Sequence, residues 1–153
     1  MRALIQRVSS AEVTIPGHRI ASISAGLLVL LGIAESDDET HARYIVEKIT
    51  NLRIFSDKES RFQYSALEVG AEMLVVSQFT LYANTRRGRR PDFRQSARPE
   101  IAEKLYEHVT RTLKETGLQI STGQFGADMQ VTLTNDGPVT LMVDSSDQSS
   151  PHH

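Results

Sequence analysis

The sequence predicts an α+β fold in which antiparallel sheets form a barrel-like core with two main helices packed against it. Short stretches of β-branched and large apolar residues dominate the chain, while only two stretches have helical periodicity. Strands and helices do not alternate throughout, as they would in a parallel α/β protein. At 153 residues the chain is long enough for one domain with its own core.

The first third of the chain predicts an antiparallel meander followed by a helix. Turn-forming residues such as Pro16 and Gly17 separate four β-rich runs. These runs are residues 2–8, 12–15, 19–23 and 27–33. Asp37 and Asp38 then provide N-cap chemistry for a helix of about three turns. Its apolar face consists of Tyr44, Ile45, Ile49 and Leu52.

The middle of the chain predicts two strands that flank a polar hairpin. Residues 51–55, "NLRIF", form the first strand and residues 57–61 the hairpin. Residues 73–83, "MLVVSQFTLYA", are the most strongly β-forming run in the chain. We expect this run to be a central strand that is covered on both faces at its start.

The last third predicts a second helix and three strands. Pro99 suits the first turn of a helix, and Gly117 ends it. The buried stripe of this helix recurs every four residues, at Ile101, Leu105, Val109 and Leu113. The expected strands are residues 118–122, 127–134 and 139–143. We therefore expect one domain over residues 1–145 and a disordered tail over residues 146–153, which are too polar to pack.

Composition narrows the possible chemistry and location. The chain has no cysteine, which excludes disulfides and thiolate nucleophiles, and no two histidines have metal-ligand spacing. We expect no metal and no cofactor. The N-terminus lacks the apolar core of a signal peptide, and the apolar run at residues 25–34 is shorter than the roughly 20 residues of a membrane helix. We therefore expect a cytoplasmic protein that does not contact a membrane.

The charge is unevenly distributed. The net charge is −2, but residues 86–98 contain six arginines and one acid, which gives that segment +5 and the remainder −7. A local cationic patch on an acidic protein indicates an anionic partner, because the arginine fork suits phosphate. A solvated loop that pairs with nearby acids is the alternative.

Two short motifs are candidates for chemistry, since phosphate-binding loops and nucleophile elbows are missing from the sequence. In "SQFTL", Ser77 to Leu81, an apolar strand abruptly gains polar side chains, which need partners or a ligand unless the strand simply leaves the core. "NDGPVT", residues 135–140, has the composition of a plain turn. Yet a Gly-Pro step also presents carbonyl acceptors without a proline N–H donor, and a cis peptide there costs little.

With these residues in hand, the chain resembles the D-aminoacyl-tRNA deacylases of the bacterial and eukaryotic type, the D-tyrosyl-tRNA(Tyr) deacylase family, over nearly its whole length. The stretches that carry the resemblance are "RALIQRVSSAEVT", "GLLVLLGIA", "KITNLRIF", "VVSQFTLYANTRRGRRPDF", "TGQFGADMQV" and "NDGPVT". One departure is that many relatives carry a Met-Asn pair where this chain has Phe62 and Gln63. This difference bears on substrate breadth if the loop lines the pocket.

The resemblance implies an active site built from two motifs. The first comprises Ser77, Gln78, Phe79 and Thr80, and the second comprises Asn135, Gly137, Pro138, Val139 and Thr140. It further implies a homodimer in which the Gly-Pro step of one subunit, held cis, reaches into the pocket of the other. Carbonyl groups there accept hydrogen bonds from the α-ammonium of a D-aminoacyl ester, whereas an L side chain meets backbone. Glycyl-tRNA, lacking a side chain, is expected to be cleaved as well.

The implied reaction is hydrolysis of the ester that joins a D-amino acid to tRNA, a chiral proofreading step. The N–H groups around Phe79 and Thr80 are expected to stabilise the oxyanion. Thr80 is a nucleophile or a positioning group, and we favour positioning because no histidine or lysine motif accompanies it as a base. Phe125 matches an aromatic residue near the terminal adenosine, and Arg7 matches a position that braces the Gly-Pro loop. Residues 86–98 become a contact for tRNA phosphates.

Two other functions stay open on the residues alone. A non-catalytic nucleic-acid-binding module predicts that charge reversal in residues 86–98 abolishes function, while Thr80→Ala or Pro138→Ala does little. A β-rich dimerisation module without a ligand predicts no retention of tRNA at low salt. The two co-occurring motifs favour the enzyme.

Overall fold

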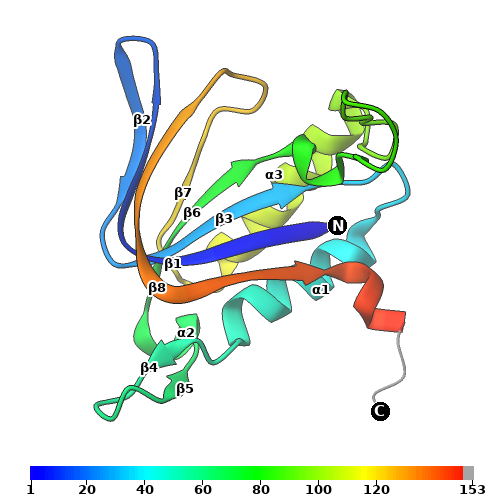
Figure 1. The fold of residues 1–153 in the computed structure, drawn as a ribbon. Coiled ribbons are helices and arrows are strands. Elements are labelled where there is room, and N and C mark those ends of the chain that lie inside the picture. Colours follow the sequence, from blue (N-terminus) through cyan, green and yellow to red (C-terminus); the bar gives the residue numbers. More distant parts are fainter. Residues whose placement is uncertain (150–153) are drawn as a thin grey trace.

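A six-stranded sheet forms the centre of the computed structural model, which describes residues 1–149 (Figure 1). The strands are β1 (Arg2–Ile15), β2 (His18–Ile23), β3 (Gly26–Gly32), β6 (Glu72–Ser77), β7 (Ile120–Thr122) and β8 (Gln130–Asp144). Their order is β2-β1-β3-β6-β7, and β8 also pairs with β1. A second sheet joins β4 (Phe55–Ser56) to β5 (Phe62–Tyr64). The helices are α1 (Glu39–Asn51), α2 (Ala66–Val69) and α3 (Pro99–Glu115), with 3-10 turns η1 (Phe79–Tyr82) and η2 (Ser145–Ser149).

The α+β class is confirmed, but the purely antiparallel arrangement is wrong. β3 pairs with β6, and β6 with β7, in parallel. The chain passes through α1 between β3 and β6, and through α3 between β6 and β7. Each crossover returns the chain to the same end of the sheet, so the next strand runs in the same direction. The pairs of β1 with β2, β3 and β8 are antiparallel.

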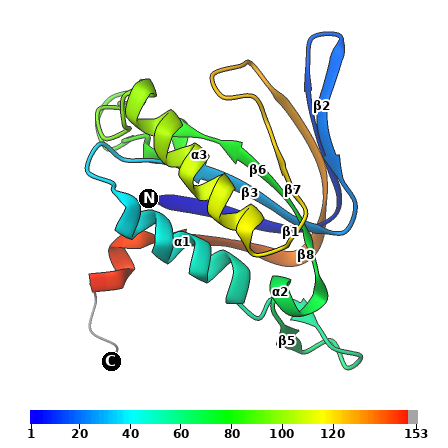
Figure 2. The same cartoon turned by 180° about the vertical axis from the view of Figure 1, so that it is seen from behind.

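The two main helices lie side by side against one face of the sheet (Figure 2). The apolar sides of the helices and the facing side chains of the sheet form the main core cluster. Its fully buried members include Ile5, Val29, Ile45, Ile49, Val75, Val109 and Leu113. Local signals set the helix ends as predicted. Asp38 caps α1 by accepting hydrogen bonds from the N–H groups of Thr40 and His41. Pro99 is the first residue of α3, and Gly117 follows its end with φ +88°.

A second buried cluster lies where the sheet curls into a nearly closed, barrel-like shape (Figure 1). The second half of β1, the first half of β8 and the strand β2 wrap around this cluster. Its members are Val8, Ala11, Val13, Ile23, Leu28, Leu74 and Val76. The sheet therefore buries apolar side chains on both faces, which explains why β3 and β6 read as continuous apolar runs.

The long central strand predicted for residues 73–83 is wrong beyond Ser77. Gln78 still donates its N–H to the Leu31 carbonyl, at 2.8 Å, but the chain then turns into η1. Gly32 permits this turn to lie close to β3, since a Cβ on Gly32 would lie 3.1 Å from the Gln78 carbonyl oxygen. The strand predicted for residues 51–55 is also shorter, because α1 continues to Asn51 and β4 begins at Phe55.

The chain end is only partly described. Ser145 is buried, and its hydroxyl and Asp37 Oδ1 each accept a hydrogen bond of 2.6 Å from the Met1 amine. Residues 145–149 form η2, and residues 150–153 of the predicted tail lie outside the described residues. None of the helices within residues 1–149 is long and apolar enough to cross a membrane.

Candidate functional site

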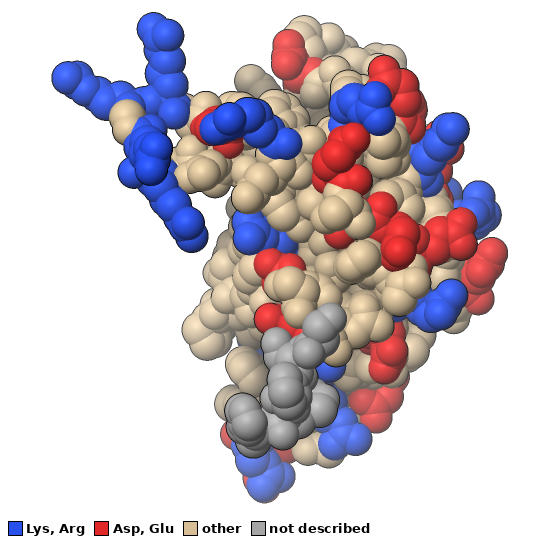
Figure 3. Space-filling model, turned by 90° about the vertical axis from the view of Figure 1, so that its right-hand side faces the viewer, with Lys and Arg blue, Asp and Glu red and all other residues tan. Residues whose placement is uncertain are grey.

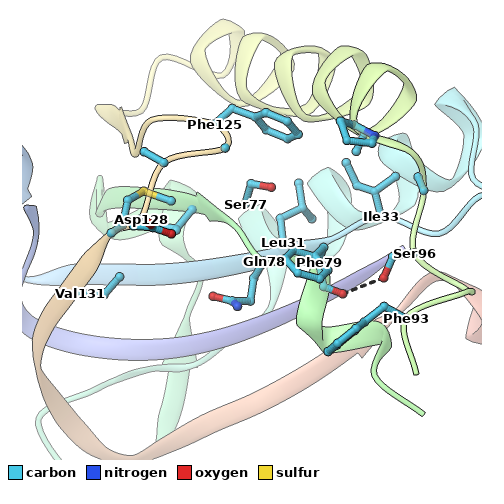
Figure 4. Close-up of a pocket in the computed structure, with 17 residues that line it drawn as sticks. Leu31, Ile33, Ser77, Gln78, Phe79, Phe93, Ser96, Phe125, Asp128 and Val131 are labelled. Atoms are coloured by element: carbon cyan, nitrogen blue, oxygen red, sulfur yellow. Dashed lines mark hydrogen bonds between the residues drawn. The ribbon is translucent and has the colours of Figure 1, made fainter. Parts of the chain in front are cut away.

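A cavity of about 670 Å³ opens beyond the carboxyl ends of the parallel strands β3 and β6 (Figure 4). Its floor comes from these strands and the turn after β6, and its walls come from η1, the start of α3 and the loop before β8. Four of the predicted site residues line this cavity, namely Ser77, Gln78, Phe79 and Phe125. The lining is mainly apolar with a few polar groups, as in small-molecule sites generally.

One wall of the cavity depends on a contact between Phe79 and the segment before α3. The rings of Phe79 and Phe93 meet edge to face, with centroids 5.2 Å apart. The Ser96 hydroxyl donates a hydrogen bond of 2.9 Å to the Phe79 carbonyl oxygen, shown as the dashed line in Figure 4. Phe79 is nevertheless 56% exposed, so this lining residue remains accessible to a ligand.

The opposite wall is held by Phe125 and α3 (Figure 4). Phe125 packs against Tyr106 with centroids 5.9 Å apart, so it is a core contact and a cavity residue at once. The Tyr106 hydroxyl donates to the Val75 carbonyl oxygen at 2.7 Å. Burial raises the pKa of Tyr106 to about 12, so this phenol remains a donor at physiological pH.

The "SQFT" segment presents unpaired backbone donors. Gln78 donates its side-chain amide to the Thr80 hydroxyl oxygen, and Thr80 lies exposed on η1, outside the cavity lining. Within residues 1–149, no hydrogen bond is formed by the N–H group of Phe79 or Thr80. Such groups at the start of a 3-10 turn are available to an oxygen that carries developing negative charge.

The "NDGPVT" segment is not a hairpin turn, so the plain-turn alternative is wrong, and the two strands expected at residues 127–134 and 139–143 are one strand, β8. Both flanks of the segment pair with β1: Asn135 lies opposite Val8, and Thr140 opposite Gln6. Residues 136–139 therefore form a four-residue bulge opposite Arg7 in one continuous strand, β8. The Gly137–Pro138 peptide bond is cis, and both residues are exposed. Asn135 spans the bulge by donating to the carbonyl oxygens of Arg7 and Val139, at 2.9 and 3.0 Å.

Arg7 lies buried beneath this bulge, with 7% of its surface exposed. Its guanidinium donates to the Ile54 carbonyl at 2.7 Å and to the Gly137 carbonyl at 3.5 Å. Arg7 Nε lies 3.0 Å from Asp136 Oδ2, but its N–H is not directed at any acceptor within residues 1–149, so this contact is an ion pair without a hydrogen bond. Val139 is buried beside it, and Thr140 accepts a hydrogen bond from Gln6.

The two motifs are separated within one chain. Ser77 pairs with Leu31, which pairs with Ala3, whereas the bulge lies opposite Arg7. Four residues of strand, about 13 Å, separate these positions along β1. The first motif and Phe125 are thus brought together, and the bulge and Arg7 form a second group elsewhere.

Sequence reasoning missed most of the residues that line the cavity, including Phe93, Ser96 and Asp128. Phe93 and Ser96 lie in or beside the arginine-rich segment, and Asp128 was expected to belong to the strand of residues 127–134. Asp128 instead belongs to the loop before β8 and is the one carboxylate among the described residues that line the cavity. The only sequence signal that could have placed Phe93 at the site is that "RRPDF" follows closely after "SQFTL" in the chain. Within residues 1–149, no cluster of three or more His, Asp or Glu side chains is arranged to hold a metal ion.

Comparison with known sequences finds one family over nearly the whole chain. A family model described as D-Tyr-tRNA(Tyr) deacylase matches residues 4–144. A D-aminoacyl-tRNA deacylase of Roseiflexus castenholzii (strain DSM 13941 / HLO8) is 56% identical over 146 residues, which cover 95% of this chain and 93% of the relative. One of Clostridioides difficile (strain 630) is 51% identical over 146 residues, covering 95% and 98%.

Two solved structures share the fold. A structure titled c-Myc DNA Unwinding Element Binding Protein has a TM-score of 0.88 at 40% identity, and the match covers 99% of this chain and 100% of that one. A structure described as a probable eukaryotic D-amino acid tRNA deacylase has a TM-score of 0.84 at 16% identity, covering 94% and 98%. The second likeness concerns the fold alone.

Proposed function

Because the chain belongs to the D-Tyr-tRNA(Tyr) deacylase family, we propose that its cavity binds the D-aminoacyl end of tRNA and that a second copy of the chain completes the site. The chain is a D-aminoacyl-tRNA deacylase, a hydrolase that acts on the ester bond of its substrate. The proposal concerns how it binds this ester and how it excludes the L form. We place the activity in the cytoplasm.

The observation that carries the catalytic part is the pair of free N–H groups at Phe79 and Thr80 beside the cavity. Water adds to the ester carbonyl carbon, and the carbonyl oxygen becomes negatively charged. The two N–H groups stabilise that oxyanion, a contribution worth about 3–4 kcal/mol per donor in other enzymes. The ester bond then breaks, and the ribose oxygen leaves with a proton.

Thr80 acts as a positioning group in this scheme. Its hydroxyl oxygen accepts a hydrogen bond from Gln78, which fixes the side chain at the start of η1. No histidine or lysine lines the cavity within residues 1–149, and Asp128, the carboxylate there, forms no hydrogen bond with Thr80, so a threonine nucleophile has no general base in contact with it. In this proposal, the 2′-hydroxyl of the terminal ribose helps to activate the attacking water instead.

The chiral part rests on the exposed bulge that carries Gly137 and Pro138. Neither residue lines the cavity of its own chain, and the strand register separates the two groups. A homodimer brings the bulge of one subunit to the cavity of the other, where its carbonyl groups accept hydrogen bonds from the α-ammonium. A D side chain then points outward, whereas an L side chain collides with backbone. Glycyl-tRNA passes the same filter.

The first test is single-turnover release of D-tyrosine and of L-tyrosine from matched tyrosyl-tRNAs, with Pro138→Ala measured in parallel. We expect rapid loss of the D ester alone, and a slower or less selective reaction with the variant. Cleavage of neither ester would overturn the proposal. Equal cleavage of both esters would leave the hydrolase but remove the chiral filter.

A complementation experiment tests the shared site separately. One variant carries Phe79→Pro, which removes an N–H donor at the cavity, and the other carries Pro138→Ala in the bulge. If the site is shared between subunits, a mixed dimer has one intact site. That site combines the cavity of the Pro138→Ala subunit with the bulge of the Phe79→Pro subunit. Above the residual activity of the two variants alone, random mixing should therefore restore about a quarter of wild-type activity, whereas sites confined to one chain restore none.

Non-catalytic nucleic-acid binding is the second candidate, and residues 86–98 favour it. The relative at 40% identity has a title that names DNA binding, and six arginines lie in this segment. This candidate predicts that the protein retains tRNA or single-stranded DNA at low salt but releases no amino acid. The tyrosyl-tRNA experiment above separates the two candidates.

A further inference from the structure

A narrow hairpin carries the arginines of residues 86–90 away from the body of the protein. An antiparallel bridge between Asn84 and Asp92 closes it, with hydrogen bonds of 2.7 and 2.9 Å. The Asn84 side chain accepts the N–H of Arg86 at 3.0 Å, and Gly88 adopts φ +71° at the tip. Residues 84–94, the arginine hairpin, are therefore held at their base while the tip stays exposed.

The four arginines of the tip are free of acidic partners. Arg86, Arg87, Arg89 and Arg90 are exposed, and none forms an ion pair with any carboxylate of residues 1–149. Asp92, the one acid of the hairpin, is already paired with Arg94. Figure 3 shows a group of basic side chains that projects beyond the rest of this face. The alternative that nearby acids pair with residues 86–98 therefore holds for Arg94 and Arg98, which pair with Asp92 and Glu35, but not for the four arginines of the tip.

The base of the hairpin is also a wall of the cavity. Phe93 packs on Phe79, and Ser96 donates to the Phe79 carbonyl oxygen. Phe93 is the fifth residue after Gly88, so the tip lies within about 18 Å of the wall even if the chain is fully extended. A smaller hollow of about 350 Å³ lies within the hairpin, lined by Asn84, Arg86, Arg87, Asp92 and Arg94.

We infer that the arginine hairpin binds backbone phosphates of the tRNA strand that carries the ester, within about five nucleotides of its 3′ terminus at the roughly 3.4 Å rise of a stacked strand. The inference rests on the proposed function, since it needs the terminal nucleotide in the cavity. Several exposed forks along a projecting loop suit a row of backbone phosphates, whereas a single small anion would need an enclosed site. The hairpin thereby holds the substrate and takes no part in the choice between D and L esters.

The test compares Arg89→Gln/Arg90→Gln with Arg43→Gln/Arg111→Gln, a control that removes the same charge from the helices α1 and α3. Two substrates are used: full-length D-tyrosyl-tRNA and the D-tyrosyl ester of adenosine, which has no phosphate. We expect the hairpin variant to raise KM for the tRNA substrate about tenfold and to reduce the salt dependence of tRNA binding by a slope of about 1.4–1.8, for two lost phosphate contacts. Its rate on the adenosine ester should equal that of the wild type.

The outcomes separate this inference from the proposed function. If the wild type cleaves both esters but the hairpin variant and the control bind tRNA alike, the hairpin inference is overturned. If the wild type cleaves neither ester, the proposed function fails, whatever the binding shows. A further outcome is that the wild type binds single-stranded DNA as tightly as tRNA of the same length and that the hairpin variant loses this affinity. That result would also overturn the assignment to tRNA, because the hairpin would then be a general strand-binding site.

Discussion

The guanidinium of Arg7 lies directly beneath Gly137, 3.5 Å from its carbonyl oxygen, and the same group donates to the Ile54 carbonyl at 2.7 Å. A buried arginine thereby connects the exposed bulge of β8 to the segment before β4. Because a guanidinium carries donors on separate nitrogens in a fixed plane, it can hold both carbonyl groups at once. The position of the bulge depends on this contact.

Arg7→Lys should therefore disturb the bulge, although the charge is kept. A single ammonium cannot reach both carbonyl oxygens, so one of these buried contacts is lost. We expect the free energy of unfolding to fall by about 1–3 kcal/mol and D-ester hydrolysis to slow at least about tenfold. Urea unfolding and single-turnover kinetics measure the two effects. Arg19→Lys, at an exposed ion pair with Glu12, is the control, and equal behaviour of the two variants would contradict the role of Arg7.

Replacing Thr80 distinguishes positioning from nucleophilic attack. If the hydroxyl only positions Gln78 and the turn, Thr80→Ala should slow single-turnover hydrolysis by about tenfold to a hundredfold, and Thr80→Ser should restore most of the rate. Loss of a nucleophile would instead cost about 10⁴-fold or more. A trapped acyl-enzyme in wild-type protein, absent from Thr80→Ala, would show that the positioning role is wrong.

Tyr106→Phe should destabilise the protein mildly without changing its shape. The substitution removes the hydrogen bond to the Val75 carbonyl, but that oxygen still accepts the N–H of Gly123 at 3.2 Å. We expect a loss of about 1 kcal/mol in the free energy of unfolding, measured with urea. Tyr44→Phe is the matched control, because the Tyr44 hydroxyl makes no hydrogen bond within the described part of the chain. A Tyr106→Phe protein as stable as the control would argue against this hydrogen bond.

Asp144 should make stability depend on acid pH. Burial opposes its charged form, but hydrogen bonds from the Ser146 N–H and the Arg2 side chain outweigh this effect, so its pKa lies below the ordinary 3.8. Since the folded pKa is lower than the unfolded one, the contribution is complete above about pH 4–5 and is lost as pH falls through the folded value.

Asp144→Asn measures this contribution. Because the pair with Arg2 is partly exposed, we expect a loss of less than about 1 kcal/mol at pH 7. The gap between variant and wild type should close as pH falls from about 5 to about 2. Glu103→Gln, at an exposed position of α3, provides the control titration. A gap that is constant over this range would show that Asp144 contributes through packing alone.

Local patterns predicted the parts of the fold that depend on neighbouring residues. Asp38 and Pro99 marked the helix starts, since capping and proline effects act within one turn. The polar hairpin around residues 57–61 was also correct, and it links β4 to β5. Ser77, Gln78, Phe79 and Phe125 were expected at one site, and all four line the cavity, whereas Thr80 of the same motif lies outside the lining.

Local patterns of the same kind failed to predict the structure of segments whose conformation depends on pairing with distant strands. Ser77 to Leu81 has the propensity of a strand, yet β6 ends at Ser77, and Gly32 on the neighbouring strand admits the turn. "NDGPVT" has the composition of a hairpin, yet its flanks pair with a third strand and the segment becomes a bulge. Phe93 lines the cavity beside Phe79, and the contact between their rings is a tertiary one.

By itself, the sequence determined the two main helices, the α+β class and the two motifs that identify the family, because capping, periodicity and motif spacing are properties of consecutive residues. Only the tertiary structure decided that β3, β6 and β7 run parallel, that β8 is one strand, and that Arg7 lies beneath Gly137. These features depend on the register between strands that are far apart in the chain. Register is set by which faces are buried together, and no single segment contains that information.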